Sequence, residues 1–81
     1  MSKWEKLREK ILSGHSDANI RFDEMCALLQ REGYALHISG SHHVFQKPNW
    51  PALNLQPRGS HVKPYQVKQV RTAFIEKGHS A

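Results

Sequence analysis

Acidic residues are scarce in most of this chain of 81 residues, and their absence excludes one class of enzyme. Between Gly33 and Ile75 there is no aspartate or glutamate. Nucleases that depend on magnesium hold the ion with clustered carboxylates. The second half of the chain therefore lacks the ligands that such a nuclease needs.

Cysteines and long apolar runs are equally scarce. The single cysteine, Cys26, excludes an internal disulfide and a cysteine-based zinc cluster, and its apolar surroundings predict a small buried hydrophobe. No apolar run approaches the ~20 residues that span a bilayer. The first residues also lack the apolar stretch of a secretory signal. We therefore expect a cytoplasmic protein without membrane contact.

The positive charge lies in the second half of the sequence. Residues 1–32 hold six basic and six acidic side chains, which cancel. Residues 33–81 hold six basic side chains and one acidic one, so they carry the whole formal charge of +5, together with five of the six histidines. Such segregation is typical of a surface that binds a polyanion. The alternative is a solvated basic face without a partner.

The length predicts one domain over residues 1–81, and its first third predicts two helices. Ser2 and Glu5 have the spacing of a capping box, and Gly14 is placed to end the first helix. A polar connection over residues 15–19 follows. The second helix is expected from about Phe22 to Glu32, with Gly33 ending it. Its predicted inner stripe consists of Phe22, Met25, Cys26 and Leu29.

After Gly33 the pattern changes from helical to alternating, which predicts strands. The expected strands are residues 34–38, residues 42–47 after a turn at Gly40, and residues 52–56. Residues 57–60 are expected to form a loop. Pro64 suits the first turn of a last helix that ends near Gly78. The predicted buried stripe of this helix is Val67, Val70 and Phe74, with Lys68 and Arg71 toward solvent.

This order predicts an α+β fold of two layers. Three antiparallel strands form the sheet, and the helices cover one of its faces in the order α-α-β-β-β-α.

His42 is the side chain best suited to chemistry. Histidine titrates near neutral pH and is the usual general acid or base in cells. RNA can be cut without a metal because its own 2′-hydroxyl can attack the adjacent phosphate. Such an enzyme needs a base for the hydroxyl proton and cations for the phosphorane charge. His42, first on its strand after a glycine turn, is the predicted base. The alternative is an exposed strand histidine without a task.

His43 points to the face opposite His42 if the strand is regular. One of the two rings then faces the helices, but the spacing does not decide which, because Val44 accompanies His42 and Phe45 accompanies His43. A packing or hydrogen-bonding role is the main expectation for His43. His37 and His61 are candidates to approach the same region.

A zinc site is the rival use of these histidines. Structural zinc sites usually include cysteine thiolates, and catalytic ones often include a carboxylate. Neither accompanies the histidines in this sequence. We therefore expect no metal and no cofactor.

The basic residues of the second half are candidate phosphate contacts. Lys63 stands out because it precedes Pro64, and a helix N-terminus offers free amides and a positive dipole to an anion. Trp50 and Tyr65 either stack on bases or cover the edge of the small core. The predicted RNA-binding set is Ser41, His43, Lys47, Arg58, Lys63, Lys68 and Arg71.

Residues 22–78 resemble the HicA family of toxins, the mRNA-cleaving partners in type II toxin–antitoxin pairs. The resemblance rests on the run Gly40-Ser41-His42-His43-Val44-Phe45, on Gly33 before the first strand, and on Lys63-Pro64 at the last helix. It implies a fold similar to double-stranded-RNA-binding domains and a ribosome-independent endoribonuclease activity. The family's catalytic histidine follows Gly-Ser, which falls on His42.

The resemblance also implies a HicB-type antitoxin that covers the active site and that, as a complex, acts on the shared promoter. The protein then contacts DNA only indirectly, through its complex with the antitoxin. This chain departs from the family pattern in two places. Residues 1–20 form a helical extension before the HicA-like core of residues 21–78. Gln56-Pro57-Arg58 stands where the family often carries another histidine, and His61 lies further on.

We therefore predict a toxin that is a metal-independent endoribonuclease with His42 as its base. The alternative is a non-catalytic module that binds double-stranded RNA. A DNA-binding regulator built on the first two helices is disfavoured, because residues 1–32 are neutral and DNA affinity depends on neutralising phosphates. The group that protonates the leaving oxygen stays open between His43 and Lys47, as do the cleavage sequence, the oligomeric state, the role of the extension and the identity of the antitoxin.

Overall fold

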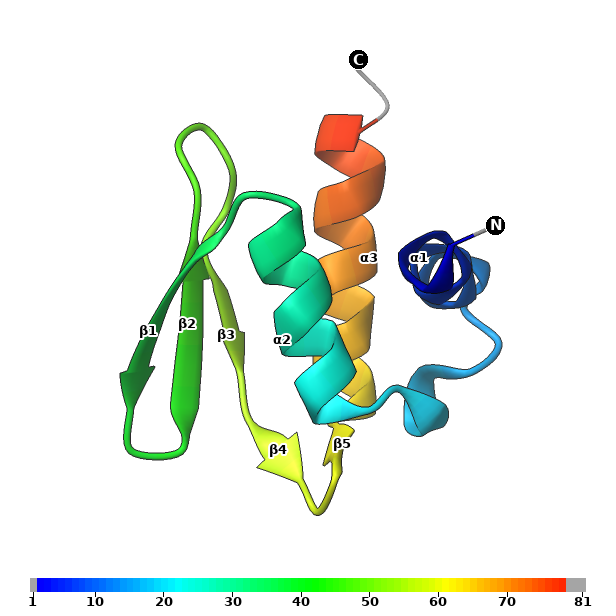
Figure 1. Ribbon diagram of the computed structural model, residues 1–81, viewed down its shortest axis with the longest axis horizontal. Coiled ribbons are helices and arrows are strands. Elements are labelled where there is room, and N and C mark those ends of the chain that lie inside the picture. Colours follow the sequence, from blue (N-terminus) through cyan, green and yellow to red (C-terminus); the bar gives the residue numbers. More distant parts are fainter. Residues whose placement is uncertain (1, 79–81) are drawn as a thin grey trace.

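A three-stranded antiparallel sheet lies on one side of the molecule, and helices cover one of its faces (Figure 1). The computed structural model describes residues 2–78 and the side chains of residues 2–76, so residues 1 and 79–81 of the predicted domain lie outside the described part. The helices are α1 (Lys3–Ser13), the short 3₁₀ helix η1 (Asp17–Asn19), α2 (Phe22–Arg31) and α3 (Pro64–Gly78). The strands are β1 (Ala35–Ser39), β2 (His42–Gln46), β3 (Leu53–Leu55), β4 (Pro57–Arg58) and β5 (His61–Val62).

The predicted α+β class is confirmed, with three α-helices and a sheet of order β1-β2-β3. Local chemistry sets the helix ends. The Ser2 hydroxyl accepts a hydrogen bond from the Glu5 amide at 3.1 Å, as an N-cap does. Gly14 ends α1 in the left-handed conformation with φ of 74°. Pro64 opens α3, as expected for a residue without a backbone donor.

The hydrophobic core lies between the sheet and the helices. Phe45 and Leu55 of the sheet are fully buried against α2 and α3. The predicted stripes are largely confirmed, since Met25 and Leu29 of α2 are also fully buried. In α3 the buried residues are Val67, Val70, Ala73 and Phe74.

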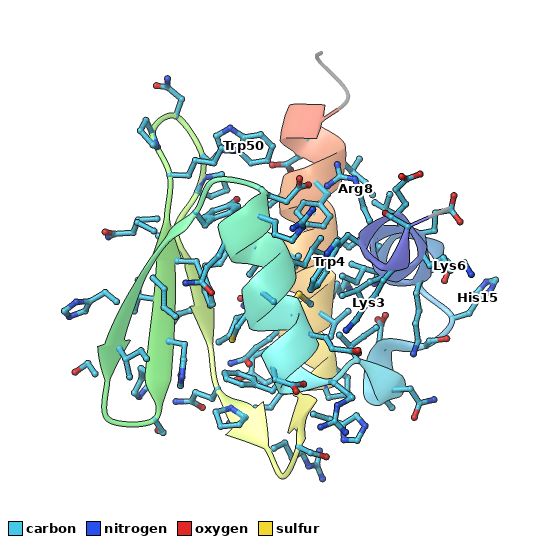
Figure 2. The ribbon with its side chains drawn as sticks, viewed as in Figure 1. Lys3, Trp4, Lys6, Arg8, His15 and Trp50 are labelled. Atoms are coloured by element: carbon cyan, nitrogen blue, oxygen red, sulfur yellow. The ribbon has the colours of Figure 1, made fainter. Side chains whose placement is uncertain are left out.

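Helix α1 adds an outer layer to the predicted two. Figure 1 shows it nearly end-on, on the side of α2 and α3 that faces away from the sheet. Its Leu7 and Ile11 belong to the same core cluster as the sheet residues. Figure 2 shows Trp4 and Arg8 between α1 and the other two helices. Arg8 pairs with Glu32 and lies 4.3 Å from the ring centre of Phe74.

The prediction that Arg71 faces solvent is wrong. Its guanidinium donates to both carboxylate oxygens of Asp17 at 2.9 and 3.1 Å, and to the carbonyl of Ile11 at 3.2 Å. Its side chain is only 17% exposed. Since Asp17 lies 54 residues away in the chain, helical periodicity gave no sign of this pair. These hydrogen bonds of Arg71 hold η1 and the end of α1 against α3.

The segment predicted as a loop over residues 57–60 begins with a strand, β4, which pairs with β5 directly after the segment to form a second, two-stranded sheet. Strands β4 and β5 pair Pro57 with Val62 and Arg58 with His61. The Val62 amide donates to the Ile20 carbonyl, and the Phe22 amide donates to the Ser60 carbonyl, both at 2.9 Å. Strands of two residues are too short to show a period, which is why only a loop was predictable here. None of the helices in the described range is both long and apolar enough to cross a membrane.

Candidate functional site

The turn between β1 and β2 decides where the His42 ring points. Gly40 has φ of 60°, which suits the first central residue of a two-residue type II′ turn. The turn pairs Ser39 with His42, and the register then continues to Leu36 opposite Phe45. Because Phe45 is buried in the core, alternation sends His43 to the helix side and His42 to the open face. His42 is exposed.

His43 has the packing role expected for it. Its ring meets the edge of Phe22 on α2, with ring centres 4.8 Å apart and planes at 83°. Its Nδ1 lies 3.4 Å from the Ser41 carbonyl oxygen, a long contact. His43 is therefore half-buried beneath α2 and does not share the open face with His42.

Gln56 joins His42 to Lys63. The Gln56 Oε1 accepts a hydrogen bond from the Lys63 ammonium at 2.6 Å. An ammonium only donates, so the amide oxygen faces Lys63 and the amide nitrogen faces His42. The Gln56 Nε2 lies 3.0 Å from His42 Nε2 and 3.1 Å from Nδ1. A single amide thus separates the imidazole from the lysine.

Asn54 indicates which ring nitrogen carries the lone pair. Its Oδ1 lies 3.3 Å from His42 Nδ1. An amide oxygen only accepts, so this contact suits a hydrogen on Nδ1. The lone pair then sits on Nε2, where the Gln56 amide can donate to it. In this tautomer the His42 Nε2 lone pair faces the Gln56 amide nitrogen, so a substrate hydroxyl has to displace that amide before Nε2 can accept its proton.

A second glutamine fixes Gln56. Gln66 is 4% exposed, and its side-chain Oε1 accepts from the Gln56 backbone amide at 2.8 Å. Gln66 lies in the first turns of α3, so the start of this helix and the end of β3 are tied together. A pocket of about 240 Å³ opens here, lined by His42, Asn54, Gln56, Tyr65, Gln66 and Gln69.

The site lies at the end of the molecule where α2 and α3 both begin. Figure 1 shows the β1–β2 turn, the β4–β5 hairpin and the first turns of both helices at this end. Helix N-termini carry a positive dipole. Arg58 on β4 is exposed and pairs across the hairpin with His61. His61 is half-buried, and its Nδ1 lies 3.0 Å from the Ser60 hydroxyl.

The cations of this end differ in whether an acidic side chain pairs with them, and Arg21, directly before α2, pairs with Asp23. Four ion pairs form among the described residues, and all four carboxylates come from residues 1–32. Arg58, Lys63 and Lys68 take part in none of them within residues 2–76. These three predicted contacts are thus available to an anion. Lys68 is exposed on α3, next to Gln69 of the pocket.

Lys47 lies elsewhere. It follows the far end of β2, five residues from His42, which corresponds to about 16 Å along a strand. Its ammonium donates to the Glu32 carbonyl at 2.6 Å and lies 4.3 Å from the ring centre of Trp50. Trp50 is half-buried and meets the edge of Tyr34, so it covers the core. Of the two aromatics considered for stacking, Tyr65 is the exposed one, at 58%.

Two further predicted residues lie near the turn. Ser41 is exposed in the turn itself, directly before His42. His37 is exposed on β1 and pairs with Val44, so its ring belongs to the same face as His42 but points from the outer strand. Asn54, Gln66 and Gln69 belong to no motif that marks them as site residues. Only the alternation of Asn54 between Leu53 and Leu55 hinted at an outward amide.

Two further kinds of reactive group are a free thiol and clusters of metal ligands. Burial, followed by the nearby Asp23 carboxylate, raises the pKa of the Cys26 thiol to about 11. Its half-buried position in α2 agrees with the expected packing role. No group of three or more histidine, cysteine or acidic side chains able to hold a metal ion occurs among the residues that the structure describes.

Comparison of the chain with protein-family models, with curated proteins and with solved structures gives no match.

Proposed function

We propose that this protein is a metal-independent endoribonuclease, with His42 as general base, and the toxin of a type II toxin–antitoxin pair. One observation carries the proposal. The exposed imidazole of His42 lies only one amide away from the Lys63 ammonium, with Nε2 facing that amide.

The chemistry needs only the substrate and these side chains. His42 Nε2 takes the proton from a ribose 2′-hydroxyl, and the 2′-oxygen attacks the adjacent phosphorus. The bond from phosphorus to the 5′-oxygen of the next nucleotide then breaks, and that oxygen takes a proton from the Lys63 ammonium. The products are a 2′,3′-cyclic phosphate and a 5′-hydroxyl. General acid–base help of this kind contributes about 10²–10⁴ in rate.

Lys63 supplies the charge. Its ammonium already donates to Gln56, and a phosphate oxygen is a stronger acceptor than an amide oxygen. Arg58 and Lys68, which have no ion pair among the described residues, hold the flanking phosphates. The observed positions favour Lys63 over His43 and Lys47 as the group beside the leaving oxygen, since His43 packs under α2 and Lys47 lies at the far end of β2.

The order α2-β1-β2-β3-α3 supports a fold similar to double-stranded-RNA-binding domains. The resemblance of residues 22–78 to HicA toxins supports a cytoplasmic mRNA interferase and a HicB-type antitoxin as partner. Promoter DNA is bound only by their complex.

The alternative function is a non-catalytic module that binds double-stranded RNA. The free cations and the layered fold favour it as much as they favour the nuclease. The binding module differs from the nuclease because it needs His42 at most as an RNA contact and not as a base.

The deciding experiment incubates purified protein with a labelled mRNA fragment in EDTA and analyses the new ends. The proposal expects cleavage that survives EDTA, with 2′,3′-cyclic phosphate and 5′-hydroxyl ends, and no cleavage at a 2′-deoxy nucleotide. Binding without cleavage supports the alternative module. Cleavage that EDTA abolishes, or 5′-phosphate ends, contradicts the mechanism.

A further inference from the structure

We propose that the pocket beside His42 binds one nucleobase of the RNA and prefers adenine. This inference rests on the proposed function and names the substrate feature that the same site selects. The pocket measures about 240 Å³, below the ~300–1,000 Å³ of sites for drug-sized ligands. It suits one planar group better than a whole nucleotide.

The lining has the hydrogen-bonding character of a base reader. Four of its six residues carry side-chain amides, and none carries a carboxylate, ammonium or guanidinium. Side-chain amides offer a donor next to an acceptor, as base edges do. The four amides belong to Asn54, Gln56, Gln66 and Gln69.

Gln66 forms a buried polar part of this lining. With 4% exposure it is the buried polar side chain of the described core. Its Oε1 is used by the Gln56 backbone amide at 2.8 Å. Its Nε2 has only a 3.4 Å contact with the Tyr65 hydroxyl, a distance at the weak end for a hydrogen bond. A buried amide nitrogen with so poor a partner gains from an acceptor in the pocket.

Tyr65 supplies a stacking surface. It stands in the first turn of α3, lines the pocket and is 58% exposed. Single-stranded RNA is read by splaying bases onto aromatic rings while polar groups contact the base edges. The Asn54 and Gln56 amides already contact His42, and Gln56 also accepts from Lys63. The pocket therefore combines the Tyr65 ring with the Gln69 amide and the Gln66 Nε2 as the groups that would read the base edge.

The choice of adenine follows from the residue types. Guanine is read most often by arginine or lysine, and cytosine by carboxylates, whereas asparagine and glutamine pair with adenine through one donor and one acceptor. Only the last of these residue types lines the pocket. Because His42 itself forms one wall, the base belongs to a nucleotide next to the bond that is cut.

The test uses the full chain and short oligouridines with a single variable base. Fluorescence anisotropy gives Kd for 2′-fluoro versions, which have no attacking hydroxyl, and the ribose versions give cleavage rates in EDTA. We expect adenine at the variable position to bind about tenfold more tightly than any other base, the size of a good amide–base pair. Gln69→Ala should reduce that preference to about twofold or less. Tyr65→Ala should weaken binding about 5- to 100-fold, and Tyr65→Phe should restore it.

The matched control is Gln30→Ala, which removes an exposed glutamine from α2, away from the pocket. It should keep the adenine preference. Equal binding of all four bases, or a preference that survives in both Gln69→Ala and Tyr65→Ala, overturns the subsite even if cleavage persists. Adenine-selective binding without any cleavage supports the subsite and overturns the nuclease. No RNA binding at all overturns both.

Discussion

Arg71 was predicted to contact RNA, but its contacts in the fold indicate a structural role. In the fold its guanidinium makes two hydrogen bonds to Asp17 and one to the Ile11 carbonyl. The two side chains are 17% and 24% exposed, so solvent screens the pair only in part. Arg71→Ala should therefore destabilise the protein and leave RNA affinity nearly unchanged.

The size of the effect follows from this burial. Removing one partner of a fully buried ion pair costs about 3–5 kcal/mol. Single hydrogen bonds to charged groups contribute about 1.5–3 kcal/mol. The residual exposure of Arg71 and Asp17 places the loss at about 2–3 kcal/mol. In a domain of this size it should lower Tm by about 10–20 °C.

The assay is urea unfolding followed by far-UV circular dichroism, with Kd for RNA measured well below Tm. A double-mutant cycle with Asp17→Ala should give a coupling of at least about 1 kcal/mol between the two side chains. The control, Lys68→Ala on the exposed side of α3, should change stability by less than about 0.5 kcal/mol. An unchanged urea midpoint in Arg71→Ala, or a loss of RNA affinity larger than that of Lys63→Ala, would refute this reasoning.

Three further predictions concern other parts of the molecule. Gln56→Leu breaks the link between His42 and Lys63 and should lower the cleavage rate about tenfold or more, whereas Gln46→Leu, on the exposed far end of β2, should not. Cys26, with its pKa raised by burial from 9.0 to about 11, should react with iodoacetamide at pH 7.5 about 100-fold more slowly in the native protein than in urea. Because the pKa of the thiol is 9.0 in the unfolded chain and about 11 in the fold, the buried thiol lowers the stability of the fold as pH rises from 9.0 to about 11. Cys26→Ala should remove this part of the alkaline loss of stability. Ser2→Ala deletes the N-cap of α1 and should cost about 1 kcal/mol in urea unfolding.

Each of these has a clear opposite outcome. Equal rates for the Gln56 and Gln46 variants would remove the glutamine from the site. A native thiol that reacts as fast as the unfolded one would show that Cys26 is open to solvent. A Ser2 variant as stable as the parent would mean that the end of α1 contributes nothing to the fold.

Helix ends and strand pairing were predictable because their signals are local. Ser2, Gly14 and Pro64 act on backbone groups within one turn of themselves, so each could be read from its neighbours. The alternation of Leu53 and Leu55 likewise identified a strand with one buried face. The three predicted strands and the last helix were confirmed on this basis.

The direction of the His42 ring was not predictable. Both faces of β2 carry one histidine and one apolar residue, and the choice depends on whether Phe45 or Val44 enters the core. The structure settles this by burying Phe45, whose partners Leu36 and Leu53 come from two other strands.

Side chains whose partners are distant in the chain were also beyond the sequence. Lys47 looked like a free cation, but it donates to the Glu32 carbonyl at the end of α2. Gln56 stands where the family pattern has a histidine, yet it contacts both His42 of β2 and Lys63 directly before α3. Neither contact follows from spacing, because each joins elements that only the fold brings together.

The most direct test of the central claim compares His42→Ala with His37→Ala in RNA cleavage with EDTA present. Both residues are exposed on the same face of the sheet, but only His42 contacts Gln56. The account predicts that His42→Ala lowers the cleavage rate about 10²-fold or more while RNA still binds, and that His37→Ala cleaves at close to the parent rate. Undiminished cleavage by folded His42→Ala would contradict it.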